Sequence, residues 1–283
     1  MNNFLLRQYG ALIKRELLEH RNLFLGGPIL VAILLLAALL WVINFGAQDV
    51  IVVLLTQAGE ITEGMRGSAL APLLMPMAVP FVITLFIGLL AYLINTLYQD
   101  RRDMSILFWQ SMPVANINTV MSKVITAGFI APIFMVAVLV VLMLVCAFSI
   151  TVLAAINDVD SVGLGQMLVA ILNCALLVYM TVVLAGLWLL PTLGWLLLFS
   201  AFAKSQPLMW AIVTFILIAI LEGLVFDTQY LADWSESRSG FYSYLVLQPS
   251  DFFDRLFSYD MLFGIFLGSL IITGATYMRR FAD

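Results

Sequence analysis

Charged residues are scarce in this chain of 283 residues. Asp, Glu, Lys and Arg fill 11% of its positions, whereas hydrophobic residues fill 63%. Soluble domains carry about 25% charged residues, so a water-soluble fold has too little polar surface to cover this composition. The shortage of charge excludes a soluble globular protein and predicts an all-α polytopic membrane protein, with residues 1–283 as a single transmembrane domain.

Residues that perform chemistry are also rare. His20 is the single histidine, and the two cysteines, Cys146 and Cys174, lie within apolar runs, where we expect small buried hydrophobes. The sequence contains no G-x-x-x-x-G-K-[ST] loop for binding phosphates. We therefore expect no catalytic residue, no metal site, no cofactor bound by this chain and no nucleic-acid partner.

Long uncharged runs take the place of the missing charges. A membrane-spanning helix needs about 20 apolar residues, because the hydrocarbon core is about 30 Å thick. Runs of this length predict six spans, near residues 23–45, 71–95, 124–152, 166–198, 206–226 and 260–278. The fourth run is long enough for one helix or for two short ones, and we expect a bend or break at Pro191, which lacks the N–H needed to continue a helix.

The positions of Lys and Arg favour one crossing in the fourth run. Six spans place ten of the thirteen basic residues on one side, and this bias predicts that both termini are cytoplasmic. A second crossing in the fourth run would remove the bias. The other three basic residues, Arg66, Arg238 and Arg255, then lie outside.

Two cytoplasmic segments have helical patterns. Residues 1–21 predict an amphipathic helix in the headgroup layer, where its basic residues would contact anionic membrane lipids. Residues 98–123 form the longest predicted cytoplasmic loop. Asp100 and Asp103 suit the first turn of a helix there, and Pro113 suits its end. The apolar side of this helix needs a surface, either the lipid interface or a protein partner.

These segments resemble the membrane subunits of ABC-2 type transporters, which are mostly bacterial exporters. The resemblance rests on ALIKRELLEHRNLFL at 11–25, YQDRRDMSILFWQSMPVANINTVMSKVITA at 98–127 and LWLLPTLGWLLLFSAFAKSQPLMWAIV at 187–213. It implies the ABC-2 exporter fold, with an N-terminal interfacial helix, a cytoplasmic coupling helix and an outer re-entrant segment. It also implies a location in the bacterial cytoplasmic (inner) membrane.

The resemblance further implies a partner. In this family a separate ATP-binding subunit holds ATP and Mg, and the coupling helix docks on it. Here the docking residues would be Asp100, Arg101, Arg102, Asp103, Met104, Ile106, Leu107, Phe108 and Trp109. A second permease copy or a related permease would complete an assembly of two permeases and two ATPases. The alternatives are an ATPase-independent secondary transporter and a membrane scaffold.

Other residues are candidates for a transport path or gate. Glu222 is the one ionisable residue well inside an apolar run, and it either serves the path or simply reaches water near the end of its span. The aromatic-rich segment 227–259, with Phe252 and Phe253, predicts either an outer gate or an aromatic belt. Gly264 and Gly268 permit close helix approach, within the chain or between two copies.

Overall fold

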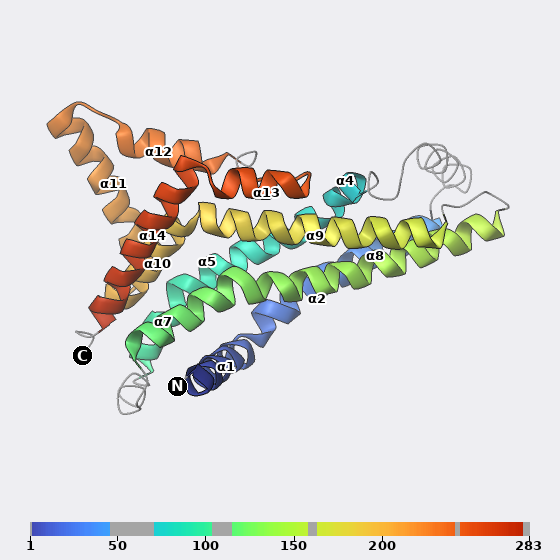
Figure 1. The fold of residues 1–283 in the computed structure, drawn as a ribbon, viewed down its shortest axis with the longest axis horizontal. Coiled ribbons are helices and arrows are strands. Elements are labelled where there is room, and N and C mark those ends of the chain that lie inside the picture. Colours follow the sequence, from blue (N-terminus) through green and yellow to red (C-terminus); the bar gives the residue numbers. More distant parts are fainter. Residues whose placement is uncertain (1, 46–70, 104–114, 158–162, 241–243, 280–283) are drawn as a thin grey trace. The chain divides into compact units, whose positions relative to one another are not determined.

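A computed structural model describes residues 2–45, 71–103, 115–157, 163–240 and 244–279, and no strand occurs within these ranges (Figure 1). The helices, some of which include π-helical or 3-10 segments (η), are α1 (Asn2–Glu19), η1 (Asn22–Gly26), α2 (Gly27–Phe45), α4 (Ala71–Leu74), η3 (Met75–Ala78), α5 (Val79–Arg102), α7 (Asn116–Ile125), η4 (Thr126–Ile130), α8 (Ala131–Ile156), α9 (Leu164–Trp188), α10 (Leu190–Phe202), α11 (Pro207–Phe226), α12 (Tyr230–Ser239), α13 (Pro249–Leu256) and α14 (Tyr259–Met278).

Six of these helical stretches are long and apolar enough to cross a membrane. They are Asn22–Val42, Met75–Arg102, Asn116–Ile156, Leu164–Trp188, Pro207–Phe226 and Tyr259–Met278. The predicted number of spans is confirmed, and the chain is a multi-pass α-helical membrane protein.

The predicted break in the fourth run is also confirmed. Helix α9 ends at Trp188 and α10 begins at Leu190, with Pro191 in the first turn of α10. Proline is tolerated at this position because the first N–H groups of a helix have no partner within the helix.

Two helices extend beyond the predicted spans. Helix α5 continues to Arg102, so Asp100 lies in its last turn and not in the first turn of a separate helix. The third span begins at Asn116 and includes Lys123. The prediction ended each span near its first charge, but these two charges are paired inside the protein, and paired charges do not end a helix.

The chain forms two compact units. Unit 1 comprises 1–20, 87–130 and 181–283, and unit 2 comprises 21–86 and 131–180. In unit 2, α2 packs against α8 and buries Phe24 of η1 at its start. A side chain at Gly27 would meet Thr84 at 3.3 Å, so the helix backbones approach closely there.

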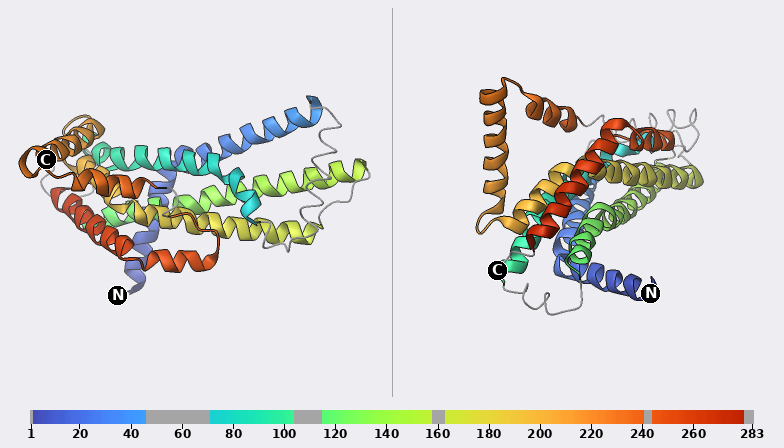
Figure 2. Two further views of the ribbon diagram at one scale, coloured as in Figure 1. Left: turned by 90° about the horizontal axis from the view of Figure 1, so that it is seen from above. Right: turned by 60° about the vertical axis from the view of Figure 1, so that its left-hand side comes forward.

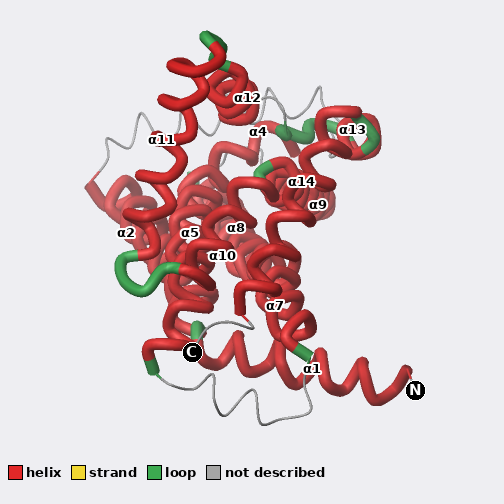
Figure 3. The backbone as a smooth tube through the Cα atoms, turned by 90° about the vertical axis from the view of Figure 1, so that its left-hand side faces the viewer, coloured by secondary structure: helices red, strands yellow, loops and turns green. Residues whose placement is uncertain are grey.

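Unit 1 is organised around α10 and α14, which pack side by side. Helix α11 leaves the end of α10, and α12 returns from the far end of α11 (Figure 2). Helix α1 lies across α7 (Figure 3). The Tyr9 hydroxyl donates a hydrogen bond of 2.9 Å to the Asn118 side chain.

Candidate functional site

A buried ion pair joins α1 to the start of the third span. The Lys123 ammonium lies 2.9 Å from a carboxylate oxygen of Glu16, and both residues are 1% exposed. Lys123 also donates to the Thr96 hydroxyl at 2.7 Å, and the Tyr92 hydroxyl donates to Glu16 at 2.8 Å. Burying a charge is costly unless it is paired and hydrogen-bonded, and this arrangement supplies both.

Asp100 extends the ion pair into a cluster. Its carboxylate faces three cations: Arg279 at 3.3 Å, Lys123 at 3.7 Å and Arg15 at 3.7 Å. A negative charge in the last turn of a helix is unfavourable next to the negative end of the helix dipole, and these cations offset it. We call these five charged residues, Arg15, Glu16, Asp100, Lys123 and Arg279, the ion cluster. It joins α1, α5, α7 and the end of α14 in unit 1.

The ion cluster also bears on the number of crossings. One crossing in the fourth run places Asp100 and Arg279 on the same side of the membrane, and two crossings would place them on opposite sides. The contact between these residues therefore supports one crossing. That this side is cytoplasmic stays a prediction from the charge bias.

The cluster keeps Glu16 ionised. Burial raises the pKa of Glu16, but the charge and hydrogen bond of Lys123, with the Tyr92 hydroxyl, outweigh burial and hold this pKa below the ordinary value of 4.5. The pair is therefore charged at neutral pH and acts as a structural link, with no proton to exchange near pH 7.

The lowered pKa predicts acid sensitivity. The stabilisation from ionised Glu16 is complete above pH 4.5, the ordinary pKa, and is lost as the pH falls through the lower folded-state value. We expect the stability difference between the natural chain and Glu16→Gln to shrink below that pH, when thermal unfolding is followed in detergent from pH 7 downward. Glu19→Gln, on the same helix, is the control. A difference that stays constant down to complete acid unfolding would contradict this prediction.

Several predicted docking residues make contacts within unit 1. Arg101 donates to the carbonyl oxygens of Ser200 at 3.0 Å and Ala203 at 2.6 Å, and so caps the end of α10. Asp100 lies in the ion cluster, whereas Arg102 and Asp103 are exposed and pair with each other at 3.1 Å. We therefore assign an anchoring role to Asp100 and Arg101. Met104, Ile106, Leu107, Phe108 and Trp109 lie outside the described residues.

His20 lies beside the ion cluster. Its ring meets the Tyr92 ring edge to face at 4.8 Å, and burial lowers its pKa. Ligand atoms of Glu16, Glu19 and His20 come within 4.8 Å of one another, a proximity that a single histidine in the sequence did not predict. The oxygens of Glu16 already accept bonds from Lys123 and Tyr92, so this carboxylate is engaged within the protein.

The predicted gate residues take structural positions. The Glu222 carboxylate accepts hydrogen bonds from the Thr228 hydroxyl at 3.1 Å and from the Leu231 N–H at 3.0 Å. It thus caps the first turn of α12. Phe252 and Phe253 lie edge to face at 5.4 Å on α13, with Phe253 exposed. Whether any of them serves a transport path stays a prediction.

Outside the ion cluster, the buried cation Arg238 of α12 contacts main-chain carbonyls. Its guanidinium donates to the carbonyl oxygens of Trp188 and Asp260, both at 2.6 Å, and lies over the rings of Trp188 and Trp234. A side chain at Gly264 would overlap this guanidinium, and one at Gly268 would meet the Leu190 backbone at 2.8 Å. Both glycines therefore serve packing within the chain.

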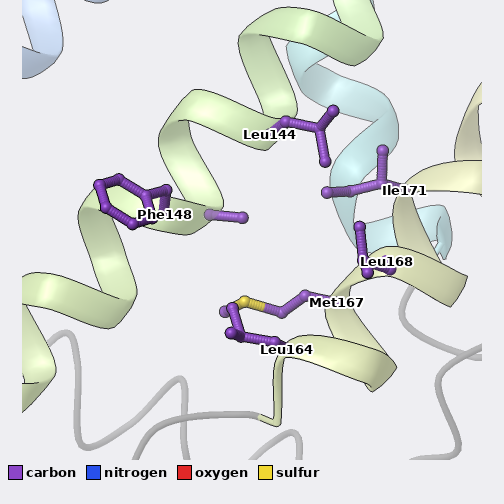
Figure 4. Close-up of a pocket in the computed structure, with 7 residues that line it drawn as sticks. Leu144, Phe148, Leu164, Met167, Leu168 and Ile171 are labelled. Atoms are coloured by element: carbon purple, nitrogen blue, oxygen red, sulfur yellow. The ribbon is translucent and has the colours of Figure 1, made fainter.

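Unit 2 contains an apolar pocket between the second half of α8 and the start of α9 (Figure 4). It is lined by Leu144, Ala147, Phe148, Leu164, Met167, Leu168 and Ile171. These side chains offer no charge or hydrogen bond to a polar ligand.

The sequence analysis missed the ion cluster and the Arg238 site. The basic residues were used there only to decide which side of the membrane each segment faces, and this holds for Lys123, Arg279 and Arg238. One signal was available for Glu16, which is spaced by one helical turn from the apolar Leu12, and both residues are buried. No sequence signal indicated which cation would meet which carboxylate, because the partners of Glu16 and Asp100 are up to 179 residues away.

Comparisons with known proteins add no family assignment. A scan against protein-family models, a search of curated proteins and a search of solved structures each find no match.

Proposed function

We propose that this chain is the membrane subunit of an ABC-2 exporter in the bacterial cytoplasmic membrane. In this proposal a separate ATP-binding subunit hydrolyses ATP with Mg and docks on residues 104–112, and two permeases work with two ATPases. The chain itself is not an enzyme. Support comes from six apolar helices, from the resemblance of segments 11–25 and 98–127, and above all from the ion cluster.

The ion cluster carries the proposal because of where it lies along the chain. Asp100 and Lys123 stand on either side of the docking segment, and both contact residues of α1 or α14. Force applied between Asp103 and Ala115 would reach α5, α7, α1 and α14 together, because paired charges fix these helices to one another. A stiff connection of this kind is what coupling between an ATPase and membrane helices requires.

The ion cluster also weakens the main alternative. A proton-coupled secondary transporter needs a buried carboxyl that exchanges protons near working pH, whereas the pKa of Glu16 is lowered by its partners. Glu16 is thus better suited to holding helices together than to carrying protons.

Docking can be tested at Leu107 and Trp109. We expect Leu107→Asp to abolish co-purification of the ATP-binding subunit with the tagged chain, because a buried charge disrupts an apolar interface. We expect Trp109→Ala to lower the number of transport events per ATP hydrolysed. A photoreactive ATP analogue identifies the subunit, and Trp210→Ala, at an exposed tryptophan of α11, is the matched control.

Two results would contradict the proposal. The first is that no polypeptide labelled by the ATP analogue co-purifies with the folded natural chain. The chain would then be a transporter or scaffold without an ATPase. The second is that Leu107→Asp and Trp109→Ala give the same co-purification and the same transport per ATP as the control Trp210→Ala. A co-purifying ATPase would then bind elsewhere, and residues 104–112 would not be the docking segment.

A further inference from the structure

Helix α11 is bounded by unusual backbone conformations. Gln206 before it has φ of 46° and Asp227 after it has φ of 50°, and these are the two residues other than glycine with positive φ in the described ranges. Side chains disfavour this left-handed region, and such residues often mark places where a chain turns sharply or changes conformation. Both ends of α11 are therefore candidate hinges.

Contacts of α11 with the rest of unit 1 gather at its start. Its buried residues are Pro207 and Ala211, and the Trp195 indole N–H donates to the Ala211 carbonyl oxygen at 3.1 Å. From Ile212 to Phe226 the helix has no buried residue. The helix is thus held mainly at its base, and the side chains from Ile212 to Phe226 are exposed or half-buried.

Helix α12 is linked to α11 by Glu222. One carboxylate oxygen binds the Thr228 hydroxyl in the connection, and the other binds the Leu231 N–H in the first turn of α12. We call residues 207–239, which comprise α11, this connection and α12, the arm.

The far end of the arm is fastened by Arg238. Trp188 is the last residue of α9, and its carbonyl is left without a helical partner where the helix breaks before Pro191. Arg238 satisfies this carbonyl and that of Asp260, and the Trp188 indole N–H donates in return to the Arg238 carbonyl at 3.1 Å. Just beyond the arm, the Val246 N–H donates to the Thr181 hydroxyl of α9, two helical turns before Trp188.

The hydrogen bonds that Arg238 makes to α9 and α14 can be exchanged for hydrogen bonds to water. Arg238 donates to neutral carbonyl oxygens, and its buried Nε atom has no hydrogen-bond partner among the residues that the structure describes. Burial lowers the pKa of the Arg238 side chain, because the charged guanidinium loses contact with water. When the arm moves away, water can replace the carbonyls around the guanidinium, so opening exchanges bonds and loses few of them. The ion cluster differs, because separating Glu16 from Lys123 breaks a buried ion pair whose two side chains are both 1% exposed.

We propose that the arm swings about Gln206 and that Arg238 is the positioning residue that latches its far end to α9 and α14. The arm thus has an open and a closed position, and the described structure is the closed one. This inference does not depend on an ATPase partner and holds for any function of the chain.

The latch can be tested by spin-label distances in the intact chain in lipid nanodiscs. Cys146 and Cys174 are first replaced by alanine, and labels are placed at Ala232 of α12 and Leu270 of α14, which are both exposed. We expect one narrow distance population in this background. Arg238→Gln should shift the ratio of open to closed arm by about tenfold or more, because it removes charge-assisted hydrogen bonds, and should add a longer distance. Combining it with Gln206→Gly should broaden that population further, because glycine has free access to both signs of φ.

Two controls make the outcome decisive. Arg255→Gln removes an arginine from α13 outside the arm and should leave the narrow population unchanged. A second label pair, at Thr192 of α10 and Leu270, reports the packing of α10 on α14 and should keep its distance in Arg238→Gln. The proposal is overturned if Arg238→Gln keeps the single narrow population, if Arg255→Gln opens the arm equally, or if the Thr192–Leu270 distance broadens as well, because Arg238 would then hold the whole unit.

Discussion

Replacing Glu16 by glutamine is expected to lower the free energy of unfolding by about 3 kcal/mol. Removing one partner of a buried ion pair costs about 3–5 kcal/mol, because the remaining charge has lost its compensation. We expect the lower end of this range because Lys123 retains its ion pair with Asp100 at 3.7 Å and its hydrogen bond to Thr96 at 2.7 Å. Thermal or denaturant unfolding of the purified chain in detergent measures the effect.

Glu19→Gln is the matched control for this substitution. Glu19 lies on the same helix and also forms an ion pair, with Arg15 at 2.7 Å, but its side chain is 45% exposed. Exposed pairs one turn apart contribute about 0.5 kcal/mol or less. Equal losses of stability for Glu16→Gln and Glu19→Gln would contradict the role assigned to the ion cluster.

A double substitution separates the pair from its surroundings. Glu16→Gln combined with Lys123→Met removes both charges, so we expect less destabilisation than the sum of the single changes, by about 1–3 kcal/mol. Asp100 keeps Arg15 and Arg279 in the double variant. Strict additivity would show that Glu16 and Lys123 do not act as a pair.

Replacing Gly268 by alanine is expected to destabilise the chain by about 1–3 kcal/mol. A Cβ atom there would lie 2.8 Å from the Leu190 backbone, and neither helix can yield without disturbing the packing of α10 on α14. Within a helix the same change would otherwise stabilise by up to about 1 kcal/mol. The packing cost outweighs this gain because the clash involves backbone atoms.

Gly274→Ala on the same helix is the control. Its Cβ would lie 3.7 Å from the Leu198 side chain, an ordinary contact, so we expect unchanged or slightly raised stability. If Gly268→Ala leaves the melting temperature unchanged and weakens dimerisation instead, the glycine pair of α14 serves contact between copies, the other role that its spacing allowed.

Much of the fold could be predicted from the sequence. Six runs of apolar residues gave six helices, because only a helix satisfies its own backbone groups in lipid. Pro191 marked the break between α9 and α10, because proline lacks an N–H. The helices that contain Asp100 and Lys123 extend beyond the predicted span ends, and the sequence does not say that these two charges are paired within the protein.

Less of the candidate site could be predicted. Arg101, predicted to dock on a partner, caps α10 within the chain, and Glu222, a candidate for a gate, caps α12. The docking and gating roles themselves stay predictions. Both side chains are polar groups near helix ends, where unpaired backbone groups attract them. Local sequence indicates that such a residue will find a partner but not which helix supplies it.

By itself, the sequence determined that the chain spans the membrane, how many times, and where its fourth span breaks, because these features depend on composition and on bonds between residues close in the chain. Only the tertiary structure decided that Glu16 meets Lys123, that Asp100 meets Arg279 and that Arg238 meets the end of α9. Charges attract over distances set by three-dimensional packing, and helices remote in sequence bring these charges within 4 Å.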